Sequence, residues 1–213
     1  MKYVIMCGGK YDKWGDTPKQ LAKVNGETLV ERTIRLLREN GVEDIAISAT
    51  NPIFEQFGVP VLKHDNERYN LKLDRVVGDW LDAFYPSSEP ICYLFGDVVF
   101  SPYAIKTIVE YETDDIMFFA SAEPLPKDYP KEWAEPFAYK VVDTVQFFTA
   151  ISRAKTMDKH HRFNRQPVSW ELWQVIKGTP INKIDYTNYV AINDYTCDID
   201  SPEDIKLFEG IAE

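Results

Sequence analysis

Glycines and lysines near the N-terminus have the residue types and spacing of an anion-binding loop. The apolar segment 2–6 runs into Gly8-Gly9-Lys10, and Pro18-Lys19 follows a short polar stretch. Glycines let backbone N–H groups approach an anion, and lysine offers compact positive charge to phosphate oxygens. The sequence contains neither G-x-x-x-x-G-K-[ST] nor G-x-G-x-x-G, so two common phosphate motifs are excluded. By itself the segment fits a phosphate loop and an ordinary glycine turn equally well.

Three aspartates could bind a metal ion. Asp97 closely follows the apolar run 91–95, whereas Asp198 and Asp200 precede Ser201-Pro202, a strong helix start. Ligands of parallel sheets bind beyond the carboxyl ends of the strands, and the glycine loop shares that edge. Oxygen ligands from two loops suit Mg²⁺, which also bridges to substrate phosphates. Each aspartate alone could be a turn residue or a helix-entry charge. Their combination with the lysine loop favours a Mg²⁺ site.

Segments with alternating strand and helix patterns must position these residues. Continuous apolar runs indicate buried strands, and apolar residues at i, i+3 and i+4 indicate helices. Thr28 and Glu31 form a capping box for a first helix that ends at Asn40-Gly41. Strands are expected over 2–6, 45–49, 59–62, 91–95, 116–120, 137–142 and 189–192, and further helices near 72–85, 102–112, 144–157, 168–176 and from Pro202 onward.

This alternation predicts an α/β fold with a mostly parallel sheet that is covered on both faces. The sequence shows no internal repeat and no low-complexity linker. We therefore expect residues 1–213 to form a single domain, with an insertion over approximately 123–190.

Composition argues against several classes of protein. The formal net charge of −10 argues against nucleic-acid binding, but it is compatible with a nucleotide held through Mg²⁺. Cys7, Cys92 and Cys197 are far apart and lie beside expected strands, which indicates buried free thiols in a reducing compartment. The chain shows no signal peptide and no long apolar run, so we expect a cytoplasmic protein without membrane insertion.

The second half contains residues that could select a substrate. Trp170, Glu171 and Tyr189 could line a pocket for a cationic head group, although packing of the insertion explains the aromatic residues better. Lys140 could reach an acceptor phosphate, and an exposed strand position explains it equally well. The basic run 159–162 with Arg165 is more typical of a solvated loop. The residues of this group are Trp133, Glu135, Phe137, Tyr139, Trp170, Glu171, Trp173, Tyr186 and Tyr189.

Together these motifs resemble the nucleotidyltransferase family that includes sugar-phosphate nucleotidyltransferases, phosphocholine cytidylyltransferase and molybdenum-cofactor guanylyltransferase. The resemblance extends over the whole chain and implies a Rossmann-like three-layer α/β/α fold of the nucleotide-diphospho-sugar transferase type. It rests on Cys7-Gly8-Gly9, Pro18-Lys19, Gly26-x-x-Leu29-Val30-x-Arg32, Phe95-Gly96-Asp97 and the segment from Asp198 to Asp204.

The resemblance also implies roles for individual residues. Asp97 and Asp200 would be the metal ligands, with Asp198 close by, and Lys19 and Asp97 would be the catalytic residues. Lys19 would act on the reacting phosphates. The family usually reads Gly-Gly-x-Gly-x-Arg in its first loop, whereas this chain has Tyr11 in place of the later glycine and Lys13 in place of the arginine. The nucleotide-binding residues implied are Cys7, Gly8, Gly9, Lys10, Lys13 and Lys19.

The implied reaction is a Mg²⁺-dependent attack by an acceptor phosphate on the α-phosphorus of an NTP, with release of pyrophosphate. CTP is the first expectation for the NTP. The acceptor would be a sugar phosphate, a polyol phosphate or a phosphocholine-like compound, bound in part by the insertion, for polysaccharide or lipid head-group biosynthesis.

Two other functions stay open. One is a glycosyltransferase of related fold, although that class usually shows Asp-x-Asp where this chain has Gly96-Asp97-Val98-Val99. The other is a non-catalytic nucleotide-binding regulator, which would need fewer charged groups. The sequence leaves open the base, the acceptor and the oligomeric state, for which a homodimer is one option.

Overall fold

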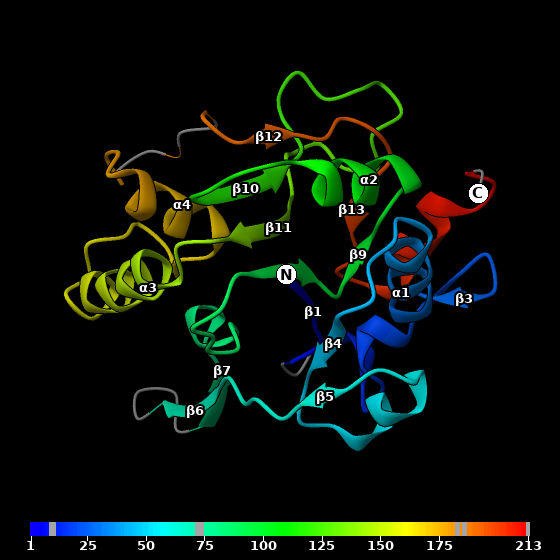
Figure 1. The fold of residues 1–213 in the computed structure, drawn as a ribbon, viewed down its shortest axis with the longest axis horizontal. Coiled ribbons are helices and arrows are strands. Elements are labelled where there is room, and N and C mark those ends of the chain that lie inside the picture. Colours follow the sequence, from blue (N-terminus) through cyan, green and yellow to red (C-terminus); the bar gives the residue numbers. More distant parts are fainter. Residues whose placement is uncertain (9–11, 71–74, 182–183, 185–186, 212–213) are drawn as a thin grey trace.

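The computed structural model describes residues 1–8, 12–70, 75–181, 184 and 187–211, and its centre is a seven-stranded sheet (Figure 1). The strands are β1 (Lys2–Met6), β4 (Ile45–Ser48), β5 (Val61–Leu62), β8 (Ile91–Phe95), β10 (Ile116–Ala120), β11 (Pro136–Val141) and β12 (Val190–Ala191). Their order is β12-β10-β11-β8-β1-β4-β5. Only β11 runs antiparallel to its neighbours within this sheet of described residues, so the expected mostly parallel sheet is confirmed.

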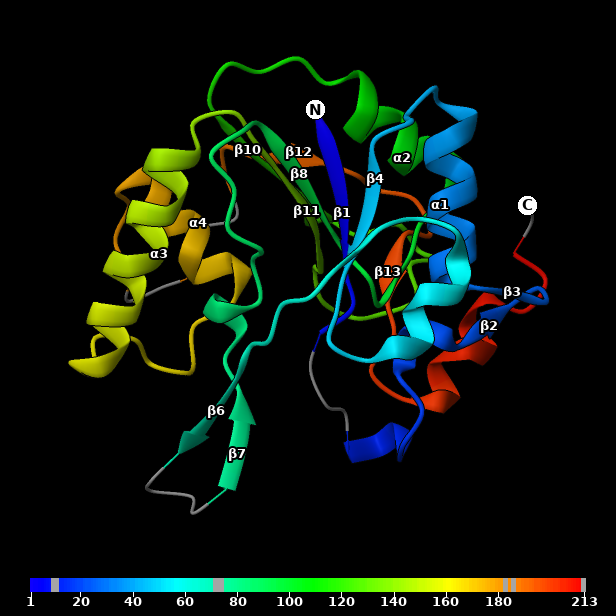
Figure 2. The same cartoon turned by 60° about the horizontal axis from the view of Figure 1, so that its bottom comes forward.

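Four α-helices cover the two faces of the sheet. Helices α1 (Leu29–Glu39) and α2 (Pro102–Glu110) lie on one face, and α3 (Thr144–Lys159) and α4 (Ser169–Lys177) lie on the other (Figure 2). The capping box of α1 is present, because the backbone N–H groups of Thr28 and Glu31 each donate to the side chain of the other residue. The helices on both faces of the sheet confirm the expected three-layer α/β/α arrangement.

Short elements complete the fold. Two-stranded sheets pair β2 (Lys23–Val24) with β3 (Glu27–Thr28), β6 (Glu67–Asn70) with β7 (Arg75–Gly78), and β9 (Val98–Val99) with β13 (Cys197–Asp198). Short 3₁₀ helices span Asp12–Trp14, Lys19–Leu21, Pro52–Phe57, Trp80–Asp82 and Pro202–Phe208. The pair β9–β13 brings the C-terminal segment against the end of the central strand β8.

The helix predicted near 72–85 is wrong. The described part of this segment contains strand β7 and the 3₁₀ helix Trp80–Asp82, and β7 pairs with β6 in an antiparallel hairpin. The pair Val76-Val77 favours a strand, because β-branched side chains lose freedom in a helix. Gly78 would also weaken a helix at its centre. Asp79 then starts the 3₁₀ helix by accepting a hydrogen bond from Leu81 N at 3.0 Å.

The main apolar core lies between the sheet and its helices, and the central strand β8 is buried along its whole length. The thiols of Cys7, Cys92 and Cys197 are buried and free, as the sequence predicts. Across the described residues, no helix combines the length and apolar character needed to cross a membrane.

Candidate active site

Lys19 joins three distant parts of the chain. Its side chain is 5% exposed, and its Nζ lies 2.6 Å from Asp97 Oδ2 and 4.0 Å from Asp200 Oδ1. The same Nζ donates a hydrogen bond to the Ile199 carbonyl at 3.1 Å. The N-terminal segment, the turn after β8 and the C-terminal segment therefore meet at one buried ammonium group.

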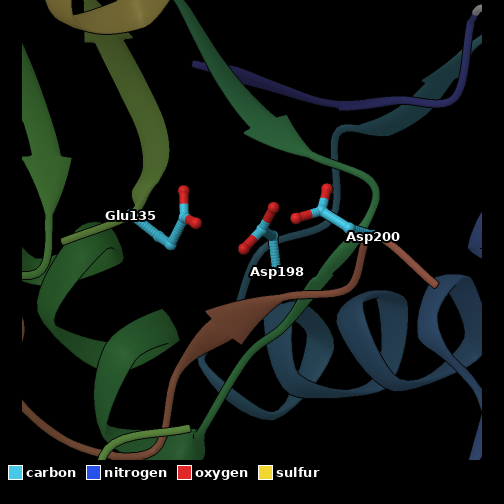
Figure 3. Close-up of side chains that lie close together, drawn as sticks. All are labelled: Glu135, Asp198 and Asp200. Atoms are coloured by element: carbon cyan, nitrogen blue, oxygen red, sulfur yellow. The ribbon is translucent and has the colours of Figure 1, made fainter. Parts of the chain in front are cut away.

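A second lysine, Lys131, reaches the same region from the loop between β10 and β11. Its Nζ lies 2.5 Å from Asp198 Oδ1, 2.8 Å from Asp200 Oδ2 and 3.0 Å from Glu135 Oε1. The three carboxylates face one another (Figure 3), and one oxygen of each lies within 4.8 Å of the others. Lys131 thus connects an acidic cluster of Glu135, Asp198 and Asp200.

Burial and neighbouring charges shift the pKa values of these groups. Burial alone would lower the pKa of Lys19, but Asp97 and the nearby aspartates outweigh it and raise that pKa. The pKa of Lys131 is also raised, because Asp198 and Glu135 outweigh burial. Burial and the charge of Glu135 raise the pKa of Asp198, and burial raises the pKa of Glu135 against the effect of Lys131. The acidic cluster therefore favours additional positive charge.

Gly96 lets the end of β8 approach β1 closely. Met6 and Phe95 are register partners, and the N–H of Gly96 donates to the Met6 carbonyl at 3.1 Å. A Cβ on Gly96 would lie 2.3 Å from that carbonyl oxygen, a distance that no side chain tolerates. Glycine at this position therefore allows the turn that presents Asp97.

The C-terminal carboxylates are held by backbone hydrogen bonds. Because β13 pairs with β9, the N–H of Ile199 donates to the Asp97 carbonyl at 2.9 Å. Asp204 accepts hydrogen bonds from the N–H groups of Asp200 at 2.7 Å and Ser201 at 2.9 Å. These bonds fix the turn from β13 into the last 3₁₀ helix and bring Asp200 beside Asp97.

A cavity of about 530 Å³ opens over these charged groups. Its walls combine acidic, basic and aromatic side chains with the backbone near Gly8 and Gly96. The lining residues are Met6, Gly8, Lys19, Asn66, Trp80, Ala83, Phe95, Gly96, Asp97, Trp133, Ala134, Glu135, Pro136, Arg165, Val168, Ser169, Trp170, Asp198 and Asp200.

The predicted nucleotide-binding residues of the N-terminal loop differ in their positions. Gly8 lines the cavity, whereas Cys7 is buried and does not line it, and Lys13 is exposed. Burial, and then the charge of Asp97, raises the pKa of the Cys7 thiol, so this thiol stays protonated. Four residues named from the sequence, Gly9, Lys10, Tyr11 and Tyr186, lie outside the described residues.

Of the residues predicted to bind substrate, Trp170 lines the cavity and three do not. Glu171 accepts from Arg165 Nε at 2.6 Å and from the N–H of Val168, at the start of α4. The hydroxyl of Tyr189 donates to a backbone carbonyl at 3.0 Å. Lys140 donates to carbonyls of 108, 109 and 111 at the end of α2, so its ammonium caps that helix.

Several residues of the cavity, and Lys131 in the acidic cluster, were not identified from the sequence. Lys131 lies in a proline-rich loop where no motif marks it, and Asn66 and Trp80 flank the β6–β7 hairpin that the periodicity missed. Glu135 and Trp133 were named only as part of an aromatic region. Arg165 belongs to a run that is typical of a solvated loop, yet it lines the cavity.

The fold is shared with solved α/β structures that include CTP transferases. A structure of the inositol-1-phosphate CTP transferase from T. maritima matches with a TM-score of 0.55 and 16% identity, over 99% of this chain and 95% of that chain. A structure of CTP:phosphocholine cytidylyltransferase from Streptococcus pneumoniae matches with a TM-score of 0.50 and 18% identity, over 99% and 98%. At these identities the likeness concerns the fold.

A family model identifies the chain more closely. Residues 3–162 match the MobA-like NTP transferase domain, and the chain belongs to this family. The matched range includes Lys19, Asp97 and Lys131, while Asp198 and Asp200 follow it. The nucleotidyltransferase family expected from the sequence is confirmed.

Proposed function

We propose that this protein transfers a nucleotidyl group from a Mg²⁺-bound NTP, with CTP as first choice, to the phosphate of a small acceptor. The observation that carries the proposal is the contact of Lys19 with Asp97 and Asp200 in one wall of a cavity of about 530 Å³. This contact joins the motifs after β1, after β8 and after β13. The family and the CTP transferases that share the fold support this reaction.

The donor atoms in the cavity fit a magnesium ion. Carboxylate oxygens are hard ligands, and the cluster of Glu135, Asp198 and Asp200 can supply several of them together with Asp97. Burial, and then the charge of Glu135, raises the pKa of Asp198 although Lys131 lies beside it, so a divalent cation would stabilise the ionised form of this carboxyl. Asp97 and Asp200 would hold the ion with Asp198 close by, and the ion would neutralise charge on the phosphates.

The side chains of the site can position two anions and offset their repulsion. An acceptor phosphate oxygen would form a bond to the α-phosphorus as the bond from that phosphorus to the β-phosphate oxygen breaks, so pyrophosphate leaves with that electron pair. Lys19 would stabilise the negative charge that develops on the α-phosphate. No general base is required, because a phosphate monoester is already ionised near neutral pH.

The aromatic wall bears on the choice of acceptor. Trp80, Trp133 and Trp170 line the cavity beside Glu135. Aromatic faces next to a carboxylate suit a compact cation, so a phosphocholine-like acceptor is our first candidate, ahead of sugar and polyol phosphates.

A pyrophosphate-release assay tests the proposal. Purified protein with Mg²⁺ is incubated with each of four NTPs and with phosphocholine, phosphoethanolamine, sugar phosphates and polyol phosphates. We expect release to require one NTP and one acceptor together, and to be lost in Asp97→Asn. Asp114→Asn, on an exposed loop away from the cavity, is the matched control.

Parallel incubations with nucleotide sugars, and nucleotide-binding measurements, identify the competing functions. Consumption of a nucleotide sugar without pyrophosphate release would contradict the proposal and indicate a glycosyltransferase. Nucleotide binding without any turnover would replace it with a non-catalytic regulator.

A further inference from the structure

Lys131 occupies the centre of the acidic cluster in a way that saturates its hydrogen-bonding capacity. An ammonium group has three N–H donors, and its Nζ has carboxylate oxygens of Asp198, Asp200 and Glu135 at 2.5, 2.8 and 3.0 Å. The Lys131 side chain is 7% exposed. This geometry is a complete coordination of one cation by three carboxylates.

The loop that carries Lys131 is anchored on both sides of it. Tyr129 is buried in a small apolar cluster with Cys197 and Ile199, and its hydroxyl donates to Ser121 Oγ at 2.9 Å. The N–H of Glu135 donates to the same Ser121 oxygen at 2.7 Å. Since these bonds hold the chain on either side, the position of Lys131 is built into the fold.

Lys131 uses oxygens that a magnesium ion at this site would need. Mg²⁺ requires short contacts to oxygen, and Asp198 and Asp200 cannot direct the same lone pairs to the ion and to the ammonium. A divalent cation would also repel the ammonium strongly in a largely buried site. A metal ion that takes the oxygens now bound to Lys131 therefore competes with its ammonium group.

We propose that Lys131 is a resident counter-ion of the acidic cluster, which yields these carboxylates when the metal binds and then pairs with a phosphate of the bound substrate. This inference rests on the proposed function for the identity of the anion. The ammonium that neutralises these carboxylates would then neutralise a phosphate of the ligand, beside the cavity wall that Asp198, Asp200 and Glu135 form.

Metal binding without any nucleotide gives the first test. Mn²⁺ affinity is measured by electron paramagnetic resonance of the free ion for wild type, Lys131→Met and the control Lys127→Met, an exposed lysine of the same loop. We expect Lys131→Met to bind Mn²⁺ about tenfold more tightly than wild type, because the competing cation is gone. Lys127→Met should match wild type. Equal or weaker binding by Lys131→Met would overturn the proposal.

The same titration with inorganic pyrophosphate separates this role from a purely structural one. In its presence the advantage of Lys131→Met should disappear or reverse, because wild-type Lys131 then pairs with the phosphates. If the advantage persists unchanged, Lys131 does not contact the anion. Absence of turnover with every NTP would remove the proposed function but leave the result with Mn²⁺ alone intact.

Two further measurements test the proposal if the Lys131→Met variant does not fold. If Lys131→Met does not fold without metal, Lys131→Gln removes the charge, keeps two N–H donors and should show the same tighter Mn²⁺ binding. In the wild-type protein, acetylation of Lys131 followed by mass spectrometry should become faster when Mn²⁺ is added and slower again with pyrophosphate, whereas Lys127 stays constant. An acetylation rate of Lys131 that does not change when Mn²⁺ is added would contradict the displacement of Lys131 by the metal.

Discussion

Lys19 and Lys131 hold the same ammonium group in different surroundings beside the site. Lys19 contacts Asp97 closely and Asp200 at 4.0 Å, and it also donates to a backbone carbonyl, so its contacts include a neutral acceptor. Lys131 contacts three carboxylates. A metal ion that takes oxygens from the acidic cluster would displace Lys131 while leaving the carbonyl bond of Lys19 intact, so Lys19 is the better candidate for the fixed positive charge of the reaction.

Replacing Lys19 by methionine should therefore affect turnover more than nucleotide binding. We expect kcat to fall by about 10²–10³-fold, as when a group that stabilises transition-state charge is removed. KM for the nucleotide should change much less. Steady-state kinetics on the substrate pair found in the pyrophosphate assay measures both constants. Lys106→Met, on the exposed side of α2, is the matched control.

Two results would contradict this role for Lys19. One is a variant with unchanged kcat and a well-formed circular dichroism spectrum. The other is a loss confined to KM, which would make Lys19 a residue of ground-state binding only.

The residues that the sequence identified are those that follow strands or begin helices. Lys19, Asp97 and Asp200 could be grouped because parallel strands share one edge and because Ser201-Pro202 marks a helix start. Lys131 could not be grouped with them from the sequence, since its position depends on the anchoring of a long loop by Tyr129. Nor does the sequence of β11 reveal that the side chain of Lys140 turns to the end of α2.

At the scale of elements, the close approach of β8 to β1 makes a stability prediction. Gly96→Ala should lower the free energy of unfolding by about 1–3 kcal/mol, because its Cβ would force the Met6 carbonyl away. Chemical denaturation followed by circular dichroism measures the change. Gly8→Ala is the contrast, because a Cβ at Gly8 would meet only the Asn66 side chain at 3.5 Å, an ordinary contact.

The two glycine variants should differ clearly. Gly8→Ala is expected to change the free energy of unfolding by no more than about 0.5 kcal/mol. Equal losses in both variants would mean that the ends of β1 and β8 relax together, and that close approach at Gly96 is not required.

The capping box of α1 predicts a pH dependence of stability. Hydrogen bonds from the backbone and side chain of Thr28 lower the pKa of Glu31 in the folded state. A depressed carboxyl pKa contributes stability above the unfolded pKa of about 4.3, and the contribution is lost as pH falls through the folded value. The stability difference between wild type and Glu31→Gln should therefore shrink between pH 6 and pH 3, as measured by urea denaturation. A difference that is independent of pH contradicts the capping role of the Glu31 charge.

Element predictions succeeded where one pattern dominated and failed where two competed. The run at β8 is apolar at every position, and Thr28 with Glu31 marks the start of α1 unambiguously. In 72–85 the apolar spacing fits a helix, but Val76, Val77 and Gly78 oppose one. Pairing with β6 decides the outcome there, and such pairing is not visible in local periodicity.

At the scale of the whole molecule, the cavity depends on segments from both ends of the chain. Gly8 and Lys19 lie near the start of the sequence, and Asp198 and Asp200 lie near its end. The pair β9–β13 and the contact of Lys19 with the Ile199 carbonyl tie these ends together. A ligand in the cavity would therefore bind the native arrangement and not the unfolded chain.

Thermal unfolding with ligands tests this coupling of the site to the fold. At a hundred times its dissociation constant a ligand adds about 2.7 kcal/mol of stability, so Mg²⁺ with the preferred NTP should raise Tm by about 5–10 °C. Addition of EDTA should abolish most of the increase, because the carboxylates would then face the triphosphate without the metal. Asp97→Asn should keep the unliganded fold but lose most of the increase, whereas Asp114→Asn should retain it. An equal rise in EDTA would show that the nucleotide binds without the metal, and no rise with any NTP would show that this cavity does not hold one.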